Sequence, residues 1–551
     1  MKKKIYLFVL FILALNTSCD DGFLDRVPYD GLSSSLIFNS DASALMAMNG
    51  AYSTLANLTF EAEFYNYVTN LGPDGFDYSR PVWGMSHSQS LATARDAQIV
   101  ANYRRFYRPI IYANDIIAGM QDNGKVSEAL RERMTGEAKF IRAICYFYLK
   151  NMFGKLVLLD KPTPVTETYL PRSTENEITD LIVKDLRDAA ERLPVAYSSA
   201  SDIGRVTKGA AIAMLGKVFL FEKKWQEAAA EFGKLLQAPF SYQLVTDYGD
   251  NFKTTTKNNV ESVFELQYVQ QDGMGSSFDR WYGNRSVQVT GGDRASMPAH
   301  LLHVFTKKDG SSVDFSTMPV RSAFPSEVAH GAAVTTWYEK SYADVDLRLH
   351  KSVIMPGATF IGAGNITYKL YFPYAPYASA VPPAINSTNN SDAKVLIRKF
   401  LTIGDEHTLF REDSQMNYPL IRFADVLLMY AEASNEAEGP GTSVYSAVDQ
   451  VRARAGVVGL PAGLSKEEMR TAIWLERYKE LLFEGHLYFD VKRWRTAHTN
   501  DPVFGLNHDV MDYRFVKVFY KKKFAERDYL WPVPQAEIDL NPQIEQNPGW
   551  Q

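Results

Sequence analysis

The stretch from residue 208 to 239 constrains the fold more than any other part of the chain. Apolar residues recur there every three or four positions, which is the spacing of one face of a helix, in two runs separated by the polar letters EKK. Gly216 in the first run and Ala228 in the second are small, as expected where two helices cross closely. Pro239 ends the second run. The pattern therefore predicts a pair of packed antiparallel helices.

The same stretch fits most of the tetratricopeptide template, W-x₂-L-G-x₂-Y followed by A-x₃-F and a proline. The matching residues are Ile212, Leu215, Gly216 and Phe219, then Ala228, Phe232 and Pro239. The template's tryptophan is replaced. Because one repeat cannot be stable alone, a second unit is expected around Ala431, Ala433, Ala447 and Val451. A generic helical hairpin remains the alternative.

The rest of the chain divides into three zones. Residues 19–240 read mostly as helices, with a capping box at Thr174 and Glu177 opening a helix that is expected to run to Pro194. Residues 241–410 are rich in Gly, Ser, Thr, Asn and Pro and hold short strand-like pieces. Residues 411–551 return to helix and end in a Pro- and Asn-rich tail. We predict one mainly α domain over 19–551: a frame of tetratricopeptide-like hairpins with an irregular, loop-rich insert containing small β elements.

The first 18 residues are predicted to be a lipoprotein signal peptide. Three lysines precede an eleven-residue apolar run, Ile5 to Leu15, which is too short to span a membrane. Small residues then precede Cys19, the predicted lipidation site, so the only membrane contact expected is an N-terminal lipid anchor. Ordinary secretion with cleavage nearby is the alternative. Asp20 and Asp21 resemble the export signal of Bacteroidetes surface lipoproteins.

Composition excludes several functional classes. With 46% hydrophobic and 22% charged residues the chain can bury a large core, and a net charge of −5 argues against nucleic acid as a partner. The H-E-x-x-H, G-x-G-x-x-G, Walker and G-x-S-x-G motifs are absent. His300 and His303 lack an obvious third ligand, so no metal or other cofactor is expected. Cys145, on an apolar helix face, is expected to be an inert core thiol.

Three C-terminal blocks carry a family resemblance. They are YPLIRFADVLLMYAEASNEA from Tyr418, IWLERYKELLFEGHLYFDVKRW ending at Trp494, and YLWPVPQAEIDLNPQIEQNPGW ending at Trp550. Together with the start CDDGFLD, they resemble the SusD/RagB family of nutrient-binding outer-membrane lipoproteins. The resemblance implies a lipid-anchored protein on the extracellular face of the outer membrane. It also implies a SusC-like TonB-dependent transporter as partner, for which the lipoprotein is a lid that captures oligosaccharides. Peptide capture, as in the RagB branch, is the alternative.

Charged residues in these blocks invite a catalytic interpretation that we do not favour. Glu476, Glu480 and Glu484 are spaced four apart on one expected helix, close to Arg477 and Asp490. Such density could suggest acid–base chemistry. A structural ion network joining the last helices is the stronger prediction, and no enzymatic activity is expected.

A glycan site needs flat aromatic faces for sugar rings and paired polar groups for hydroxyl edges. Two loop stretches offer both. The candidate ligand-binding residues are Asp74, Asp77, Tyr78, Arg80 and Trp83 in the first stretch, and Asp279, Arg280, Trp281, Tyr282, Asn284 and Arg285 in the second. Trp337 is a further candidate. The alternative for each aromatic residue is that it anchors its loop on the frame. A glycoside hydrolase using Asp74 and Asp77 is a weaker hypothesis.

Overall fold

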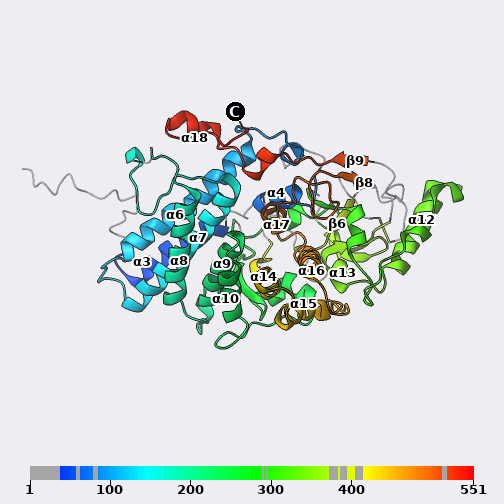
Figure 1. Ribbon diagram of the computed structural model, residues 1–551, viewed down its shortest axis with the longest axis horizontal. Coiled ribbons are helices and arrows are strands. Elements are labelled where there is room, and N and C mark those ends of the chain that lie inside the picture. The colour runs from blue at the N-terminus through cyan, green and yellow to red at the C-terminus, as the bar shows by residue number, and fades with distance from the viewer. Residues whose placement is uncertain are drawn as a thin grey trace, which may run out of the picture.

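The computed structural model describes residues 37–56, 63–77, 85–167, 169–271, 273–287, 291–292, 294–371, 382–384, 394–403, 414–511 and 518–550. The predicted lipidation site Cys19 and the candidate residues Tyr78, Arg80 and Trp83 lie outside these ranges. The described chain is mainly helical with a few short strands (Figure 1), which confirms the predicted fold class.

The N-terminal zone forms successive packed helices, as predicted. They are α3 (Asp41–Ala56), α6 (Ala97–Met120), α7 (Glu128–Phe153), α8 (Glu175–Arg192), α9 (Lys208–Phe221) and α10 (Trp225–Lys234). Each of α6 to α9 packs on the next helix in the chain. The capping box at Thr174 and Glu177 is present, and α8 ends at Arg192, just before Pro194. Shorter helices are α4 (Glu63–Leu71) and α5 (Met85–Ser88).

Both predicted hairpins exist. In the α9–α10 pair, a Cβ added to Gly216 would lie 2.7 Å from the ring of Phe232, so only glycine permits this close crossing. The second pair is α14 (Phe423–Glu438) with α15 (Thr442–Arg454), where Ala431, Ala433, Ala447 and Val451 are buried. Because α10 packs on α14, and α14 on α16 (Lys466–Glu480), the helical frame is continuous in space although residues 241–410 interrupt it in sequence.

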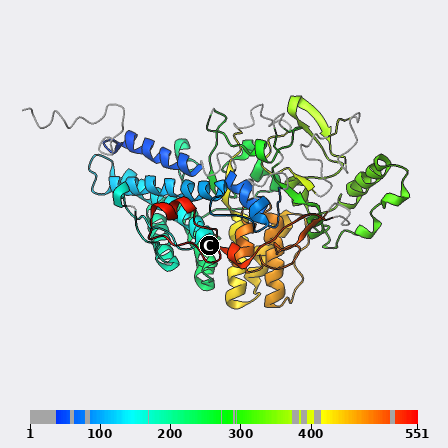
Figure 2. The same ribbon diagram turned by 90° about the horizontal axis from the view of Figure 1, so that it is seen from above.

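Within the described residues, the insert contributes strands to three small antiparallel sheets. Strand β1 (Ser262–Leu266) pairs with β7 (Tyr418–Arg422). Strands β2 (Ser296–Pro298), β6 (Lys394–Ile397) and β3 (Val353–Ile354) form the second sheet, and β4 (Thr359–Gly362) with β5 (Ile366–Lys369) the third. Figures 1 and 2 show α12 (Glu327–Ser341), a helix of the insert, at the opposite end of the molecule from α3.

Some elements were not expected from the sequence. The insert contains α12 (Glu327–Ser341) and α13 (Leu347–Ser352) as well as the single turn α11 (Phe278–Trp281). Helix α12 buries His330, Val334, Trp337 and Tyr338, which do follow helical spacing, but the surrounding Gly and Ser residues hide that signal. The C-terminal zone adds α17 (Leu487–Arg493), a hairpin of β8 (Asp509–Met511) and β9 (Val518–Lys521), and α18 (Gln535–Leu540).

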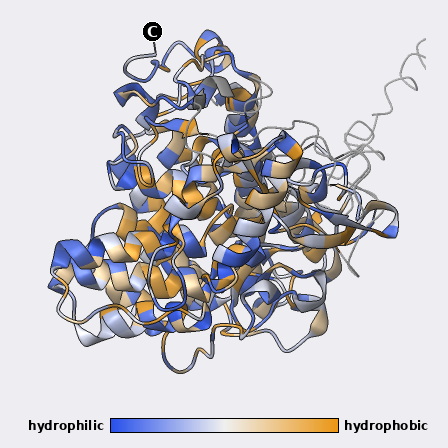
Figure 3. Ribbon diagram, turned by 90° about the vertical axis from the view of Figure 1, so that its right-hand side faces the viewer, coloured by the Kyte–Doolittle hydropathy of each residue, from blue (hydrophilic) through white to orange (hydrophobic). Residues whose placement is uncertain are grey.

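Figure 3 shows hydrophobic segments in the interior and hydrophilic ones mostly at the periphery. Among the residues described, no helix is both long enough and apolar enough to cross a bilayer. Cys145 is fully buried, and burial raises the pKa of its thiol, in agreement with an inert core position.

The predicted ion network is present and buried. The Glu480 carboxylate accepts hydrogen bonds from Arg348 (3.2 Å), Arg422 (2.9 Å) and Arg454 (2.5 Å). Glu484 accepts from Arg422 and from Lys399 (3.0 Å). Burial alone would raise the pKa of Glu480, but Arg454, Arg422 and Arg348 outweigh it and hold that pKa well below its ordinary value. These carboxylates therefore serve the structure as anions.

Removing one member of this network should destabilise the fold strongly. In Arg422→Met the carboxylates of Glu480 and Glu484 stay buried with less positive charge beside them, so we expect the free energy of unfolding to fall by about 3–5 kcal/mol. Urea unfolding measures it. The control is Arg495→Met, whose partner Glu526 is 71% exposed, and which should cost at most about 1 kcal/mol. Equal losses of unfolding free energy in the two variants would contradict a larger stabilising role for the buried network.

Candidate ligand-binding site

The structure brings the two predicted ligand stretches together. Phe76 N–H donates to the Ser296 carbonyl (3.0 Å), and Ser296 N–H donates back to Phe76 (3.2 Å). The hydroxyl of Tyr282 lies 3.5 Å from that of Thr69, which is 213 residues away in the sequence. The Asn70 side chain donates to the Arg294 carbonyl. The loop after α4 and the loop around α11 therefore form one local structure.

Lys522, which directly follows β9, holds the first loop. Its ammonium donates to the carbonyls of Asn70 (3.2 Å), Gly72 and Gly75 (2.5 Å). Burial lowers the pKa of Lys522, and burial raises that of nearby Asp74, while their opposite charges act against both shifts. Sequence patterns do not indicate this role, because Lys522 stands in a run of three adjacent lysines. Its neighbour Lys521 is exposed.

Asp74 itself is a positioning group in this arrangement. Its carboxylate accepts a hydrogen bond from the backbone N–H of Phe483 (2.8 Å), just beyond α16. Asp74 and Asp77 are 2% and 5% exposed. The first loop is therefore fixed from two sides, by Lys522 and by the end of α16.

Buried polar groups hold the second loop in the same way. Asp279 accepts hydrogen bonds from the backbone N–H of Thr402 (2.8 Å) and from the Thr402 hydroxyl. Burial raises the pKa of Asp279 to about 7. Asn284 accepts from the N–H groups of Ser286 (2.8 Å) and Val287, which closes a turn within the loop.

The aromatic side chains of the second loop are packed inside the molecule. Trp281 is 5% exposed and Tyr282 1%. The guanidinium of Arg280 lies 4.4 Å from the centre of the Trp281 ring, and Tyr282 packs against the rings of Phe278 and Phe400. Because these faces are covered, a sugar could stack on them only after neighbouring groups moved. Ligand contact by Asp74, Asp77, Asp279, Trp281, Tyr282 and Asn284 stays a prediction.

Among the described candidate residues of the two loops, those that are not buried are arginines. Arg285 is exposed, while Arg280 and Arg294 are half-buried. A guanidinium presents several N–H donors in one plane, which suits two adjacent sugar hydroxyls. Arg294 was not among the predicted contacts.

Trp337 lies elsewhere. It is on α12, its indole N–H donates to the Thr317 hydroxyl (2.9 Å), and its ring packs against Phe315 and Tyr338. Figures 1 and 2 show α12 at one end of the molecule and α4 near its middle. Trp337 is therefore not joined to the two loops by these contacts, and its ligand role stays a separate prediction.

The histidines do not form a metal centre within the described residues. His300 pairs with His508 rather than His303, with ring centres 5.2 Å apart. Burial lowers the pKa of His300 to about 3 and that of His508 to about 4, so both rings are neutral at ordinary pH. No three His, Cys, Asp or Glu side chains of the described chain lie where one ion could join them.

Comparison with known proteins gives a consistent picture. A family model described as the SusD family matches residues 260–550, and one described as starch-binding associating with outer membrane matches residues 22–220. Similar curated proteins include SusD-like protein P2 of Formosa agariphila (26% identical, covering 100% of both chains). Another is starch-binding protein SusD of Bacteroides thetaiotaomicron (22%, covering 79% of this chain and 75% of that one).

Solved structures share the fold. A SusD-like carbohydrate binding protein from Bacteroides fragilis superposes with a TM-score of 0.74 at 24% identity, covering 92% of this chain and 100% of the other. A laminarin binding SusD-like protein gives a TM-score of 0.67 at 22% identity, covering 93% and 100%.

The pKa of Asp279 leads to a pH-dependent prediction. The carboxyl keeps its proton up to about pH 7 in the folded protein but only to about its ordinary value of 3.8 when unfolded. The contribution of this carboxyl to the free energy of unfolding is therefore complete below pH 3.8 and is lost as pH rises through 7. Relative to Asp279→Asn, the wild type should lose up to about 4 kcal/mol of unfolding free energy across this interval.

Urea titrations of both proteins at several pH values test this expectation. Asp344→Asn, at an exposed carboxylate, serves as the control and should follow the wild type. A constant difference between wild type and Asp279→Asn at every pH would contradict the assignment.

Proposed function

Because the chain belongs to the SusD family, we propose that it is an outer-membrane lipoprotein that captures oligosaccharides on the cell surface and delivers them to a SusC-like TonB-dependent transporter as its lid. The family is one of carbohydrate-binding proteins rather than enzymes. The observation that carries the proposal is that two loops holding the aromatic and polar residues that glycan binding needs are hydrogen-bonded to each other.

Two sets of residues would have different roles in ligand capture at this site. Arg280, Arg285 and the loop bearing Trp83 supply the ligand contacts, and the buried Asp74 and Asp279 position them. One covered sugar face contributes about 2 kcal/mol, and each net hydrogen bond about 1 kcal/mol. After the cost of association, such contacts give weak binding, in the micromolar to millimolar range. Such binding suits a protein that passes its ligand on.

Lipidation at Cys19 would tether this site to the membrane. The basic start and the apolar run from Ile5 to Leu15 support export with removal of residues 1–18. An attached diacyl group holds a protein at the bilayer without a spanning helix. A tethered lid beside a transporter keeps captured glycan close to the entrance, so the effective concentration at the entrance is high.

Two substitutions test the site on the soluble form lacking residues 1–19. After a glycan array identifies a ligand, Trp83→Ala and Arg285→Ala should each weaken its binding by about 1–3 kcal/mol in calorimetric titration, because they remove a platform and a donor pair. Trp281→Ala is a poor test, since truncating a buried tryptophan would cost about 3–5 kcal/mol of stability.

Arg104→Ala, at an exposed arginine on α6, is the matched control and should bind as the wild type does. Wild-type affinity in both site variants would remove these loops from the ligand site. Binding of oligopeptides but of no glycan would overturn the substrate class.

A further inference from the structure

The second ligand loop, around α11, is built from two chain segments that lie against each other. Gly292 N–H donates to Arg280 C=O (2.7 Å), and Arg294 N–H donates to Trp281 C=O (2.6 Å). A Cβ added to Gly292 would lie 3.2 Å from both Cγ and Nε of Arg294, so the Arg294 side chain passes over this glycine. Arg280 and Arg294 therefore come from neighbouring segments of one small structure.

Arg285 belongs to the same small structure. It follows Asn284, whose carbonyl oxygen would lie 2.3 Å from a Cβ added to Gly291, so the two segments also touch at this point. The Arg285 side chain is exposed. Within the part of the chain that the structure describes, no hydrogen bond or ion pair occupies its guanidinium. It can therefore meet a ligand without breaking a contact to those residues.

Arginines are the only side chains that this loop exposes among its described residues. In residues 275–287, 291–292 and 294–299, the positions that are not buried are Arg280, Arg285, Gly292 and Arg294. The side chains that could meet a neutral sugar, Trp281, Tyr282 and Asn284, are at most 5% exposed. The described part of the loop therefore presents positive charge to the solvent.

Nearby carboxylates do not cancel this charge. Between residues 275 and 299 the sequence has three arginines and two aspartates, Asp279 and Asp293, the second of which lies outside the described residues. Asp279 is fully buried, and burial raises its pKa to about 7, so below that pH it is mostly uncharged. In the first loop Asp74 and Asp77 are buried as well, and the charge of Lys522 opposes that of Asp74. The guanidinium groups of the second loop therefore outnumber the carboxylates that could neutralise them.

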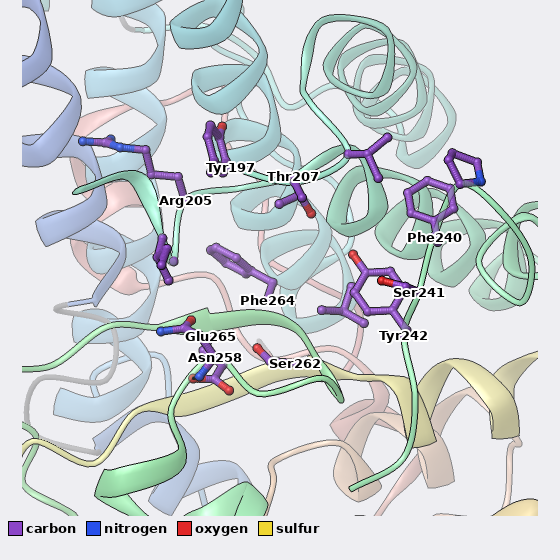
Figure 4. Close-up of a pocket in the computed structure, with 16 residues that line it drawn as sticks. Tyr197, Arg205, Thr207, Phe240, Ser241, Tyr242, Asn258, Ser262, Phe264 and Glu265 are labelled. Atoms are coloured by element: carbon purple, nitrogen blue, oxygen red, sulfur yellow. The ribbon is translucent and has the colours of Figure 1, made fainter. Parts of the chain in front are cut away.

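The arginine of the recess beside β1 shows a different arrangement. Arg205 lines this cavity of about 300 Å³ (Figure 4) and contacts Asp202 (3.0 Å) and Glu137 (3.4 Å). An anion entering that cavity would have to displace a carboxylate. No carboxylate of the described residues contacts Arg285, so the second loop is the better place for an anion.

Guanidinium groups distinguish anionic sugars from neutral ones. A guanidinium presents parallel N–H donors that match two oxygens of a carboxylate or sulfate, and such bonds are roughly twice as strong as bonds between neutral groups. The Arg280 guanidinium lies 4.4 Å from the centre of the Trp281 ring. This contact restricts its motion, so ordering it on binding costs less entropy. A neutral glycan would displace water from these charges and supply no opposite charge in return.

We propose that the ligand of the two loops is an anionic oligosaccharide, whose carboxylate or sulfate groups bind the guanidinium groups of Arg280, Arg285 and Arg294. This inference rests on the proposed function and names the chemical class of its ligand. The net charge of −5 on the whole chain opposes an anion at long range, but salt screens charges beyond about 8 Å at physiological ionic strength. The arginines of the loop therefore dominate the interaction at contact distance.

A panel of oligosaccharides tests the proposal on the soluble form lacking residues 1–19. It contains hexasaccharides of galacturonate, of alginate and of sulfated carrageenan, neutral maltohexaose, laminarihexaose and xylohexaose, and any further glycan that binds on the array. In calorimetric titration, at least one anionic member should bind at least about tenfold tighter than every neutral one. Its carboxyl-reduced or desulfated form should lose at least about tenfold in affinity. Which of the two treatments weakens binding shows whether carboxylate or sulfate is recognised.

The variant Arg285→Gln separates charge from hydrogen bonding, because glutamine keeps N–H donors but carries no charge. It should lose at least about tenfold more affinity for the anionic oligosaccharide than for the uncharged form of the same sugar. Arg104→Gln, at an exposed arginine on α6, is the matched control and should bind as the wild type does. Circular dichroism checks that both variants fold.

Three results would overturn the proposal. They are a neutral glycan that binds as tightly as any anionic one, an uncharged form that binds as well as its charged parent, and an Arg285→Gln variant that loses no more affinity than Arg104→Gln. In each of these cases a glycan still binds, so the proposed function stands. Binding of no oligosaccharide at all would overturn the proposed function and this inference together.

Discussion

The buried cluster around Glu480 is the constraint on which both ligand loops depend. Arg348 comes from the insert, Arg422 from β7 and Arg454 from α15, and all three converge on this one carboxylate of α16. Phe483, between Glu480 and Glu484, holds Asp74 of the first loop through its N–H group. Lys399, which binds Glu484, stands three residues before Thr402, which holds Asp279 of the second loop. The cluster therefore sets the positions of two loops that are far apart in sequence.

The features that could be predicted from the sequence are those that depend on local residue patterns. Helical spacing and small residues identified the α9–α10 hairpin, and Thr174 with Glu177 identified the start of α8. The spacing of Glu476, Glu480 and Glu484 indicated an ion network, although the partner Arg348 lies in a part of the chain that shows no such pattern. Family resemblance extended the prediction to the whole fold.

The candidate site was predicted only in part. Residue chemistry selected the two loops, and the structure places them side by side. The sequence could not show that Trp281 and Tyr282 point into the core, because a Gly- and Ser-rich loop has no periodicity that separates inward from outward positions. Lys522 was missed for a related reason: three adjacent lysines look alike in sequence, and only the β8–β9 hairpin directs one of them beneath the first loop.

We propose that glycan binds at the two loops while the charged cluster beneath them stays unchanged. Hydrogen exchange of the wild-type protein, with and without a glycan that binds it, tests this most directly. We expect slower exchange in residues 72–84 and 280–294, with no change in α16 or in α12. Protection confined to α12, or to the helical frame, would contradict it.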